Sequence, residues 1–231
     1  MYEAAYAHPD GTSTVSRFAH TLSGVGFDGL VVRSRADARP EFDAAALRDE
    51  YGIDVVSGVT IDGSDPSDAS GRIGTLRTEN TIVVVQGGDA TSNRFAAESE
   101  RADVLAAPGG DVNHVIVKAA RENAVRVEFD FGPVLQQSGG PRVQALRGLR
   151  KLRELVEKYD APYVVSASPS SHLDVRAPRE LVAVGEKIGF TEEQVRTGLA
   201  EWGALAERNR ERMSADFIAP GVRKGRYEED A

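Results

Sequence analysis

The sequence contains no cysteine among its 231 residues. Disulfide bonds, thiolate metal sites and cysteine nucleophiles are therefore excluded. No segment approaches the ~18 consecutive apolar residues that a membrane-spanning helix requires. The first residues, MYEAAYAHPD, also lack the basic region and apolar core of a signal peptide. From these absences we expect a cytoplasmic protein without a membrane partner.

Lysine is scarce as well. The only lysines are Lys118, Lys151, Lys158, Lys187 and Lys224, although the chain has 28 basic residues, and the net charge is −8. This acidic, arginine-rich composition is typical of proteins from a very salty cytoplasm, because high salt screens the repulsion between surface carboxylates. A GC-rich genome would also favour arginine and alanine, so the composition alone leaves both explanations open.

Short runs rich in valine and isoleucine alternate with amphipathic segments along the chain. The expected strands are 2–8, 29–34, 54–61, 81–88, 102–108, 125–131 and 162–168. The expected helices are 12–24, 42–51, 66–78, 91–100, 111–123, 141–159, 178–189 and 192–213. Several strands are apolar on both faces, as in a covered parallel sheet. Strand–helix alternation predicts parallel pairing with right-handed crossovers.

Seven such units without a long interruption favour an α/β fold with a single, distorted TIM-like barrel of about seven parallel strands. The sequence has neither GxGxxG after its first strand nor GxxxxGK[ST], so an open nucleotide-binding sheet would lack its phosphate loop. We expect one domain over 1–213 and a flexible tail over 214–231. Asp111 is the expected cap of the helix over 111–123.

The last expected helix carries a stripe of apolar or small residues. Its members are Val195, Leu199, Trp202, Ala206 and Met213, with Asn209 in the gap. We expect this stripe to dock on the barrel, since an apolar helix face needs a core to cover it.

In barrels of this kind, functional residues gather at the carboxyl ends of the strands. Those ends carry His8, Arg33, Arg35, Asp62, Gln86, Glu128, Asp130, Ser166 and Ser168. A metal-dependent phosphoesterase would need several histidines and carboxylates around its metal. The chain has only four histidines, and only His8 ends a strand. We therefore predict no metal site and no catalytic residue in this chain.

The serines near His172 and the acidic pair each allow a catalytic and a structural interpretation. Because no GxSxG elbow is present, we interpret the serines as loop and cap residues. Glu128 and Asp130 lie two apart on one strand and so share a face. They could act as acid and base, or pair with an inward arginine such as Arg126, and we favour the structural pairing.

Two expected helices carry basic faces. On the helix over 141–159 the face consists of Arg147, Lys151 and Lys158, with Arg142, Arg150 and Arg153 adding charge. On the helix over 111–123 it consists of His114, Lys118 and Arg121. A solvated surface explains either face alone, but four of the five lysines fall between positions 118 and 187. That clustering favours contact with a polyanion.

A series of short motifs follows in a fixed order over 102–181. In chain order they are Asp103–Leu105–Pro108, His114, Glu128 with Asp130, Arg142 through Arg153, Ser166–Ala167 and Arg176–Pro178. This ordered set resembles the archaeal ribonuclease P protein component 3 family, the thirty-kilodalton RNase P subunit family. The resemblance extends over roughly residues 1–213, and with the composition it indicates a halophilic archaeon.

The resemblance implies a distorted TIM-like barrel, similar to the polymerase-and-histidinol-phosphatase barrel but lacking its metal ligands. It implies a protein subunit of the ribonucleoprotein that removes the 5′ leader from precursor tRNA. The RNA subunit would then be the catalyst and would hold the Mg²⁺ ions, with no cofactor in the chain itself. The implied partners are the ribonuclease P RNA, precursor tRNA, and other protein subunits, most directly a small paired subunit.

On this interpretation the basic residues are expected to contact RNA, with arginine forks gripping phosphates. The expected RNA-binding residues are Arg33, Arg35, His114, Lys118, Arg142, Arg147, Lys151, Arg176 and Arg179. Since binding by counterion release weakens in high salt, we expect a few local arginine contacts on an otherwise acidic body. The alternatives left open are a free-standing metal-dependent barrel phosphoesterase and a non-catalytic barrel that binds another ligand.

Overall fold

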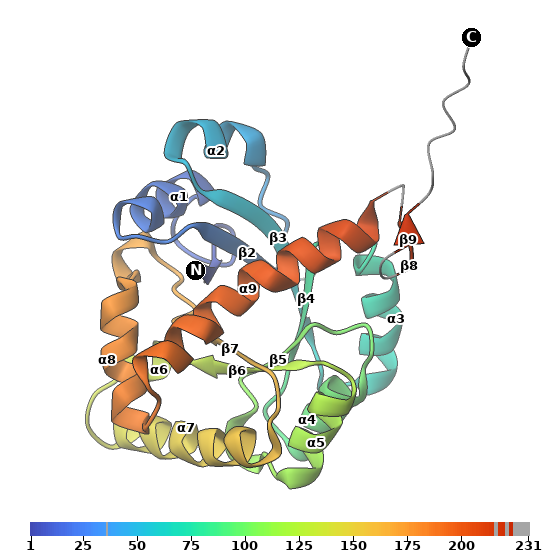
Figure 1. Cartoon of the computed structure of the whole chain (residues 1–231), viewed down its shortest axis with the longest axis vertical. Coiled ribbons are helices and arrows are strands. Elements are labelled where there is room, and N and C mark those ends of the chain that lie inside the picture. Colours follow the sequence, from blue (N-terminus) through green and yellow to red (C-terminus); the bar gives the residue numbers. More distant parts are fainter. Residues whose placement is uncertain (36, 215–216, 220–221, 224–231) are drawn as a thin grey trace.

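A computed structural model describes residues 1–35, 37–214, 217–219 and 222–223 (Figure 1). Its main sheet has seven parallel strands that pair in chain order, forming a nearly closed barrel. The strands are β1 (Tyr2–Tyr6), β2 (Gly29–Arg35), β3 (Asp54–Asp62), β4 (Ile82–Gln86), β5 (Val104–Ala106), β6 (Arg126–Asp130) and β7 (Tyr163–Ser166). Each predicted strand is present, and the predicted TIM-like fold is confirmed.

Helices follow the strands and pack around the barrel. They are α1 (Val15–Gly24), α2 (Ala44–Tyr51), α3 (Pro66–Leu76), α4 (Ala90–Glu98), α5 (His114–Glu122), α6 (Gly132–Gln136), α7 (Gly139–Tyr159), α8 (Pro178–Ile188) and α9 (Glu192–Met213). Short 3₁₀ turns, η1 (Gly109–Asp111) and η2 (His172–Asp174), precede α5 and α8. The short helix α6 was not predicted from the sequence.

Polar side chains fix where several helices begin. Asp65 and Asp89 each accept hydrogen bonds from two backbone amides of the helix that follows. Such caps satisfy amides that have no partner inside the helix. The prediction for α5 was wrong: Asn113 caps it, and Asp111 lies in η1 instead. The cap sits two residues later because the chain first makes a 3₁₀ turn.

The barrel interior is small and apolar. Side chains such as Ala4, Val31, Val84 and Val164 point inward and are almost fully buried. The opposite faces of the strands pack against the helices in a larger core. Because both faces are covered, the strands read as continuous apolar runs in the sequence.

The barrel is not closed by a ladder between β1 and β7 in the part of the chain that the structure describes. Side-chain and loop hydrogen bonds span this seam instead. The carboxylate Oε1 of Glu3 accepts from the amides of Ala4 and Ala167, at 2.9 and 3.0 Å. The amide of Tyr6 donates to the carbonyl of Pro169 at 2.9 Å. Glu3 thus supplies the acceptor that a neighbouring strand would otherwise provide.

This role places a carboxylate inside the protein. Glu3 is 1% exposed, and its other oxygen has no hydrogen-bond partner among the described residues. Burial raises the pKa of Glu3 to about 8, although the two amide hydrogen bonds act in the opposite direction. The folded protein therefore holds this proton at a pH where an unfolded chain, with a pKa near 4.3, has lost it.

Replacing Glu3 with glutamine should change how stability depends on pH. In the wild type the unfolded chain loses the Glu3 proton first, so the free energy of unfolding should fall as pH rises from about 5 to 8. Glu3→Gln keeps the accepting oxygen and does not titrate. Denaturation at pH 5, 6.5 and 8 should show the variant gaining stability relative to the wild type. Parallel pH profiles would contradict the buried proton.

Helix α9 covers the amino-terminal end of the barrel and runs across the front of the strands in Figure 1. Trp202 is fully buried, and its indole N–H donates to the carbonyl of Val165 at 3.0 Å. Leu205 and Ala206 pack with Trp202 against the inward-facing strand residues. The predicted docking of this helix is confirmed, but Met213 is 45% exposed and does not belong to the buried face.

Charged pairs hold α9 against the strand starts. Arg210 binds both carboxylate oxygens of Asp54, at 2.7 and 3.0 Å. Arg126 pairs with Glu201 at 2.7 Å. The helix therefore connects β3 and β6 across the same end of the barrel.

The segment after α9 was predicted to be a flexible tail. Two short strands within it, β8 (Phe217–Ala219) and β9 (Val222–Arg223), pair in antiparallel fashion. The rest of 215–231 lies outside the described residues, and its flexibility stays a prediction. No helix in the described ranges is long and apolar enough to cross a bilayer.

Candidate functional site

The carboxyl end of the barrel holds a buried polar network centred on Arg33 of β2. The Arg33 side chain is almost fully buried, and its Nη1 lies 2.7 Å from Oε1 of Glu128 on β6. Its guanidinium carbon stands 4.7 Å from the centre of the Tyr6 ring. Arg33 Nε also approaches the Thr60 hydroxyl at 3.4 Å. One arginine therefore joins β1, β2, β3 and β6 inside the barrel.

The end of β7 completes the network. Ser166 donates to Glu128 at 2.7 Å, and Ser168 lies 3.1 Å from Ser166 and 3.4 Å from Glu128. Ser168 has a left-handed backbone with φ of 45°, which costs free energy in a residue other than glycine. The network fixes this conformation, since Ser168 also accepts from Arg33 at 3.3 Å.

Two expectations from the sequence are corrected here. Arg33 was predicted to contact RNA, but it is 1% exposed and its guanidinium forms an ion pair with the Glu128 carboxylate. The structural pairing of Glu128 is confirmed, but its partner is Arg33. Arg126 binds Glu201 of α9 at the other end of the barrel.

Asp130 lies beside this pair at the end of β6. Its Oδ1 accepts from the amide of Gly132 at 2.8 Å. Burial raises the pKa of Asp130 to about 6, and the neighbouring Glu128 carboxylate adds to the rise. Within the described ranges, no group of three or more histidine, aspartate or glutamate side chains could hold a metal ion. The guanidinium of Arg33 supplies the positive charge beside Glu128.

The serines and His172 form structural contacts. The Nδ1 atom of His172 lies 2.8 Å from the hydroxyl of Ser13, which also accepts from the His172 amide at 3.0 Å. Ser171 caps η2 by accepting from the amide of Leu173. These contacts tie the loop after β1 to the loop after β7, which agrees with the interpretation of the serines as loop and cap residues.

A cavity of about 550 Å³ opens next to the polar network, under α7. Glu128 and Asp130 line one side, and Leu149 and Leu152 line another. The exposed residues Arg147 and Lys151 of α7 also border the cavity. The structure therefore brings two of the predicted RNA-binding residues to the rim of the barrel mouth.

The other predicted residues lie on separate elements. On α5, His114 lies 6.3 Å from the ring of Tyr159 of α7, and the Lys118 ammonium lies 5.2 Å from it. Tyr159 thus brings this pair to the carboxyl end of α7. Exposed positions among the rest are Arg35 at the end of β2, Arg142 on α7 and Arg179 on α8.

Arg176 is the half-buried member of the predicted set. Its guanidinium donates to the carbonyls of Leu173 and Val175, at 3.3 and 3.0 Å. Pro178 follows as the first residue of α8, where its missing N–H has no cost. Arg176 thus holds the turn before α8 while part of its side chain faces solvent.

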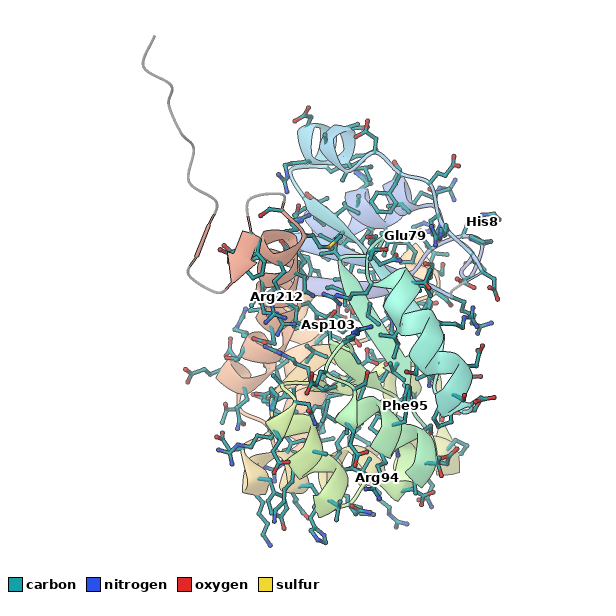
Figure 2. The ribbon with its side chains drawn as sticks, turned by 90° about the vertical axis from the view of Figure 1, so that its right-hand side faces the viewer. His8, Glu79, Arg94, Phe95, Asp103 and Arg212 are labelled. Carbon is teal, nitrogen blue, oxygen red and sulfur yellow. The ribbon has the colours of Figure 1, made fainter. Side chains whose placement is uncertain are left out.

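The opposite end of the barrel carries a charged cluster that the sequence analysis missed. Figure 2 views the molecule from the side, with His8 at one edge and Arg212 of α9 toward the other. Asp103 lies near Arg212, just before β5, and is 3% exposed. Its partners Arg77 and Arg208 come from the end of α3 and from α9. The only signal in the sequence was an aspartate at the entrance of an apolar strand.

A family model described as RNase P subunit p30 matches residues 1–214. The chain belongs to this family. Ribonuclease P protein component 3 of Halobacterium salinarum, a halophilic archaeon, is 60% identical over 233 residues, covering 100% of both chains. The resemblance found in the sequence is confirmed, and the relative's source favours the salty-cytoplasm explanation of the composition.

Solved structures support the fold of this p30 family member. A chain in a structure titled "cryo-EM structure of archaeal Ribonuclease P with mature tRNA" matches with a TM-score of 0.81 at 20% identity. The match covers 99% of this chain and 100% of that one. A histidinol phosphate phosphatase from Lactococcus lactis, in complex with zinc, L-histidinol and phosphate, matches with a TM-score of 0.55 at 8% identity. That match covers 82% of this chain and 94% of the phosphatase.

Proposed function

We propose that this chain is a non-catalytic subunit of ribonuclease P that positions RNA, while the RNA subunit holds the Mg²⁺ ions and performs the cleavage. Membership of the p30 family makes it a protein subunit of this tRNA-processing ribonucleoprotein. The main support for a non-catalytic role is the Arg33–Glu128 ion pair at the carboxyl end of the barrel. Barrel enzymes place their reacting groups at this end, and here an arginine and a carboxylate neutralise each other.

The proposed RNA contacts are the exposed basic residues on the helices and strand ends. Arg147 and Lys151 border the cavity at the barrel mouth, and His114 and Lys118 lie beside the end of α7. Arg35, Arg142, Arg176 and Arg179 remain in the proposed set. Because the net charge is −8, these sites would act through local hydrogen bonds to phosphates rather than through a broad positive field.

The proposed partners are the ribonuclease P RNA, precursor tRNA and other protein subunits, with a small paired subunit in most direct contact. We propose that the protein is located in the cytoplasm and that the chain binds no metal of its own. A free-standing metal-dependent phosphoesterase is not favoured, since Glu128 is already bound by Arg33 and by Ser166.

Charge reversal at the proposed contacts should lower cleavage by the reconstituted holoenzyme. Arg147→Glu and Arg176→Glu should each reduce cleavage of precursor tRNA about tenfold, the usual scale for losing one charge-assisted contact. Arg94→Glu is the matched control, because Arg94 is exposed on α4 and pairs with Glu98 in its own helix. Thermal unfolding of each variant would show whether the barrel remains folded.

The isolated chain is expected to cleave no precursor tRNA with Mg²⁺, Mn²⁺ or Zn²⁺. Cleavage by protein freed of co-purifying RNA with a nuclease that is then removed before substrate is added, or a divalent ion that stays bound through purification, would overturn the non-catalytic role. Unchanged cleavage by the Arg147→Glu and Arg176→Glu holoenzymes would remove these two residues from the proposed contacts.

A further inference from the structure

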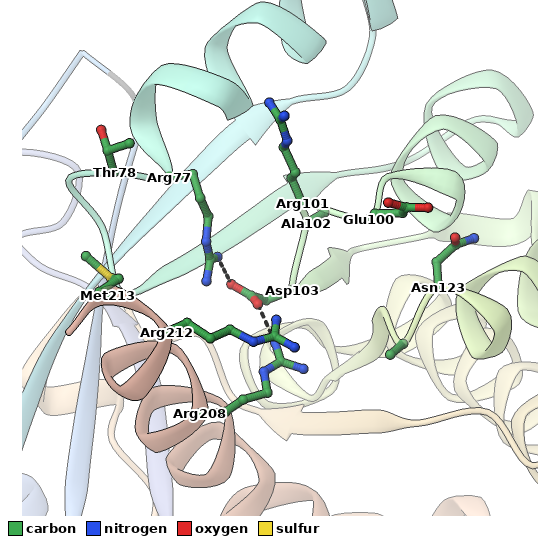
Figure 3. A pocket seen from close by; sticks show the side chains of 11 residues that line it. Arg77, Thr78, Glu100, Arg101, Ala102, Asp103, Asn123, Arg208, Arg212 and Met213 are labelled. Carbon is green, nitrogen blue, oxygen red and sulfur yellow. Dashed lines mark hydrogen bonds and ion pairs between the residues drawn. The ribbon is translucent and has the colours of Figure 1, made fainter. Parts of the chain in front are cut away.

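A cavity of about 580 Å³ opens at the amino-terminal end of the barrel, between α9 and the turn before β5 (Figure 3). Four arginines line it: Arg77, Arg101, Arg208 and Arg212. We call this cavity the arginine pocket. Only two acidic residues, Glu100 and Asp103, are among the residues that line it. The lining therefore carries two more positive than negative charges in a chain of net charge −8.

Asp103 cannot neutralise the whole pocket, because its oxygens are already occupied. Oδ1 accepts from Arg208 at 2.7 Å and from Asn209 at 3.0 Å. Oδ2 accepts from Arg77 and from the amide of Val83, the latter at 2.8 Å. A carboxylate has about four acceptor positions, and all four are used.

The other two arginines of the pocket are Arg101 and Arg212. Within the residues that the structure describes, the side chains of Arg101 and Arg212 have no hydrogen-bond or ion-pair partner. Some exposed arginines elsewhere pair, as Arg94 does with Glu98 and Arg196 with Glu192, and others, such as Arg17 and Arg142, have no such partner among the described residues. What distinguishes this pocket is that two unpaired arginines line one cavity together with Arg77 and Arg208.

Three of the pocket's arginines, Arg77, Arg208 and Arg212, lie close enough to affect one another, whereas Arg101 points away from Asp103 in Figure 3. Burial lowers the pKa of Arg208, and the charges of Arg126, Arg212 and Arg77 lower it further against the opposing effect of Asp103. Figure 3 shows Arg77, Arg208 and Arg212 converging around Asp103 from α3 and α9. Like charges held in a concave, partly desolvated site attract an anion, which would relieve their repulsion.

We propose that the arginine pocket binds a phosphate of an RNA backbone. The assignment rests on the proposed function, since an RNA-positioning subunit meets phosphates more often than any other anion. Guanidinium groups bind phosphate oxygens in pairs of parallel hydrogen bonds. Thr78 and Asn123 line the same cavity. Their donors bind backbone carbonyls of Thr75, Ala97 and Ala119, so each offers only an acceptor oxygen to a ribose hydroxyl. The pocket lies at the opposite end of the barrel from the basic residues predicted from the sequence.

The test removes the two unpaired arginines and leaves Asp103 with its partners. The variant is Arg101→Gln with Arg212→Gln, and the matched control is Arg94→Gln with Arg196→Gln. Both lose two positive charges from exposed arginines. The probe is labelled ribonuclease P RNA, titrated with full-length protein over a range of KCl concentrations.

The pocket variant should bind the RNA about tenfold more weakly than the control, and the slope of log affinity against log salt should shrink by about one to two. A second readout uses inorganic phosphate, which should protect Arg212 from an arginine-selective dicarbonyl reagent followed by mass spectrometry. Protection of the control positions Arg94 and Arg196 by RNA should be the same in the pocket variant and in the wild type.

The outcomes separate this proposal from the proposed function. If the wild type binds RNA and the pocket variant binds like its control, the pocket proposal is overturned and the function stands. If the wild type binds no RNA, the proposed function fails first. Protection of Arg212 by phosphate with unchanged RNA binding would also overturn the RNA assignment.

Discussion

Replacing Arg33 with methionine is expected to lower the free energy of unfolding by about 3–5 kcal/mol, because Glu128 then lies buried without its partner. Methionine fills much of the space of the arginine stem, so packing changes little. The hydroxyls of Ser166 and Thr60 cannot replace a full positive charge. Denaturant unfolding at high and constant KCl would measure the loss.

Two further variants test whether the loss comes from the unpaired carboxylate. Arg33→Met combined with Glu128→Leu removes both charges and should recover most of the stability, since apolar replacement of a buried pair is often neutral. Arg35→Met, at an exposed site on the same strand, should change stability by no more than about 0.5 kcal/mol. If the double variant is as unstable as Arg33→Met alone, the pairing does not explain the loss.

Truncating Trp202 to alanine should destabilise the protein by a similar amount, about 3–5 kcal/mol. The indole is fully buried among the inward residues of the barrel and also binds the carbonyl of Val165. Its loss leaves a large cavity and an unsatisfied carbonyl on the unpaired edge of β7. Thermal and denaturant unfolding should both report the change.

Trp202→Phe separates the two contributions. Phenylalanine keeps most of the buried volume but donates no hydrogen bond, so the expected loss is about 1–3 kcal/mol. Met213→Ala serves as the control, because Met213 is 45% exposed at the end of the same helix. A loss for Trp202→Ala no greater than that for Met213→Ala would show that α9 does not complete the core.

The fold was predictable from the sequence because it follows from local periodicity. Runs such as those around Val31 and Val84 are apolar on both faces, and each is followed by an amphipathic segment, so strands and helices could be assigned with small errors at their ends. The cap of α5 was missed because the 3₁₀ turn η1 delays the helix from Asp111 to Asn113. Local pattern does not reveal such a turn.

The sites were less predictable because they depend on contacts between distant segments. Arg33 and Glu128 are 95 residues apart, and from the sequence alone Arg33 could face an RNA as easily as a partner inside the barrel. Alternation along β2 puts Arg33 on the same face as Val31, but because the run is apolar on both faces, the sequence does not show which face points into the barrel. The arginine pocket combines α3, the turn before β5 and α9, and no motif in the sequence connects these three segments.

Helix α9 has a consequence for the order in which the protein can be made. The ribosome releases β1 first and residues 192–213 near the end, yet Trp202 and Leu205 cover the inner faces of strands made much earlier. A nascent chain that stops before Glu192 leaves Val31 and Val84 open to solvent at one end. Incomplete chains of this kind are prone to aggregate. Synthesis of α9 should therefore mark the point at which the new polypeptide no longer exposes the surface that chaperones and proteases recognise.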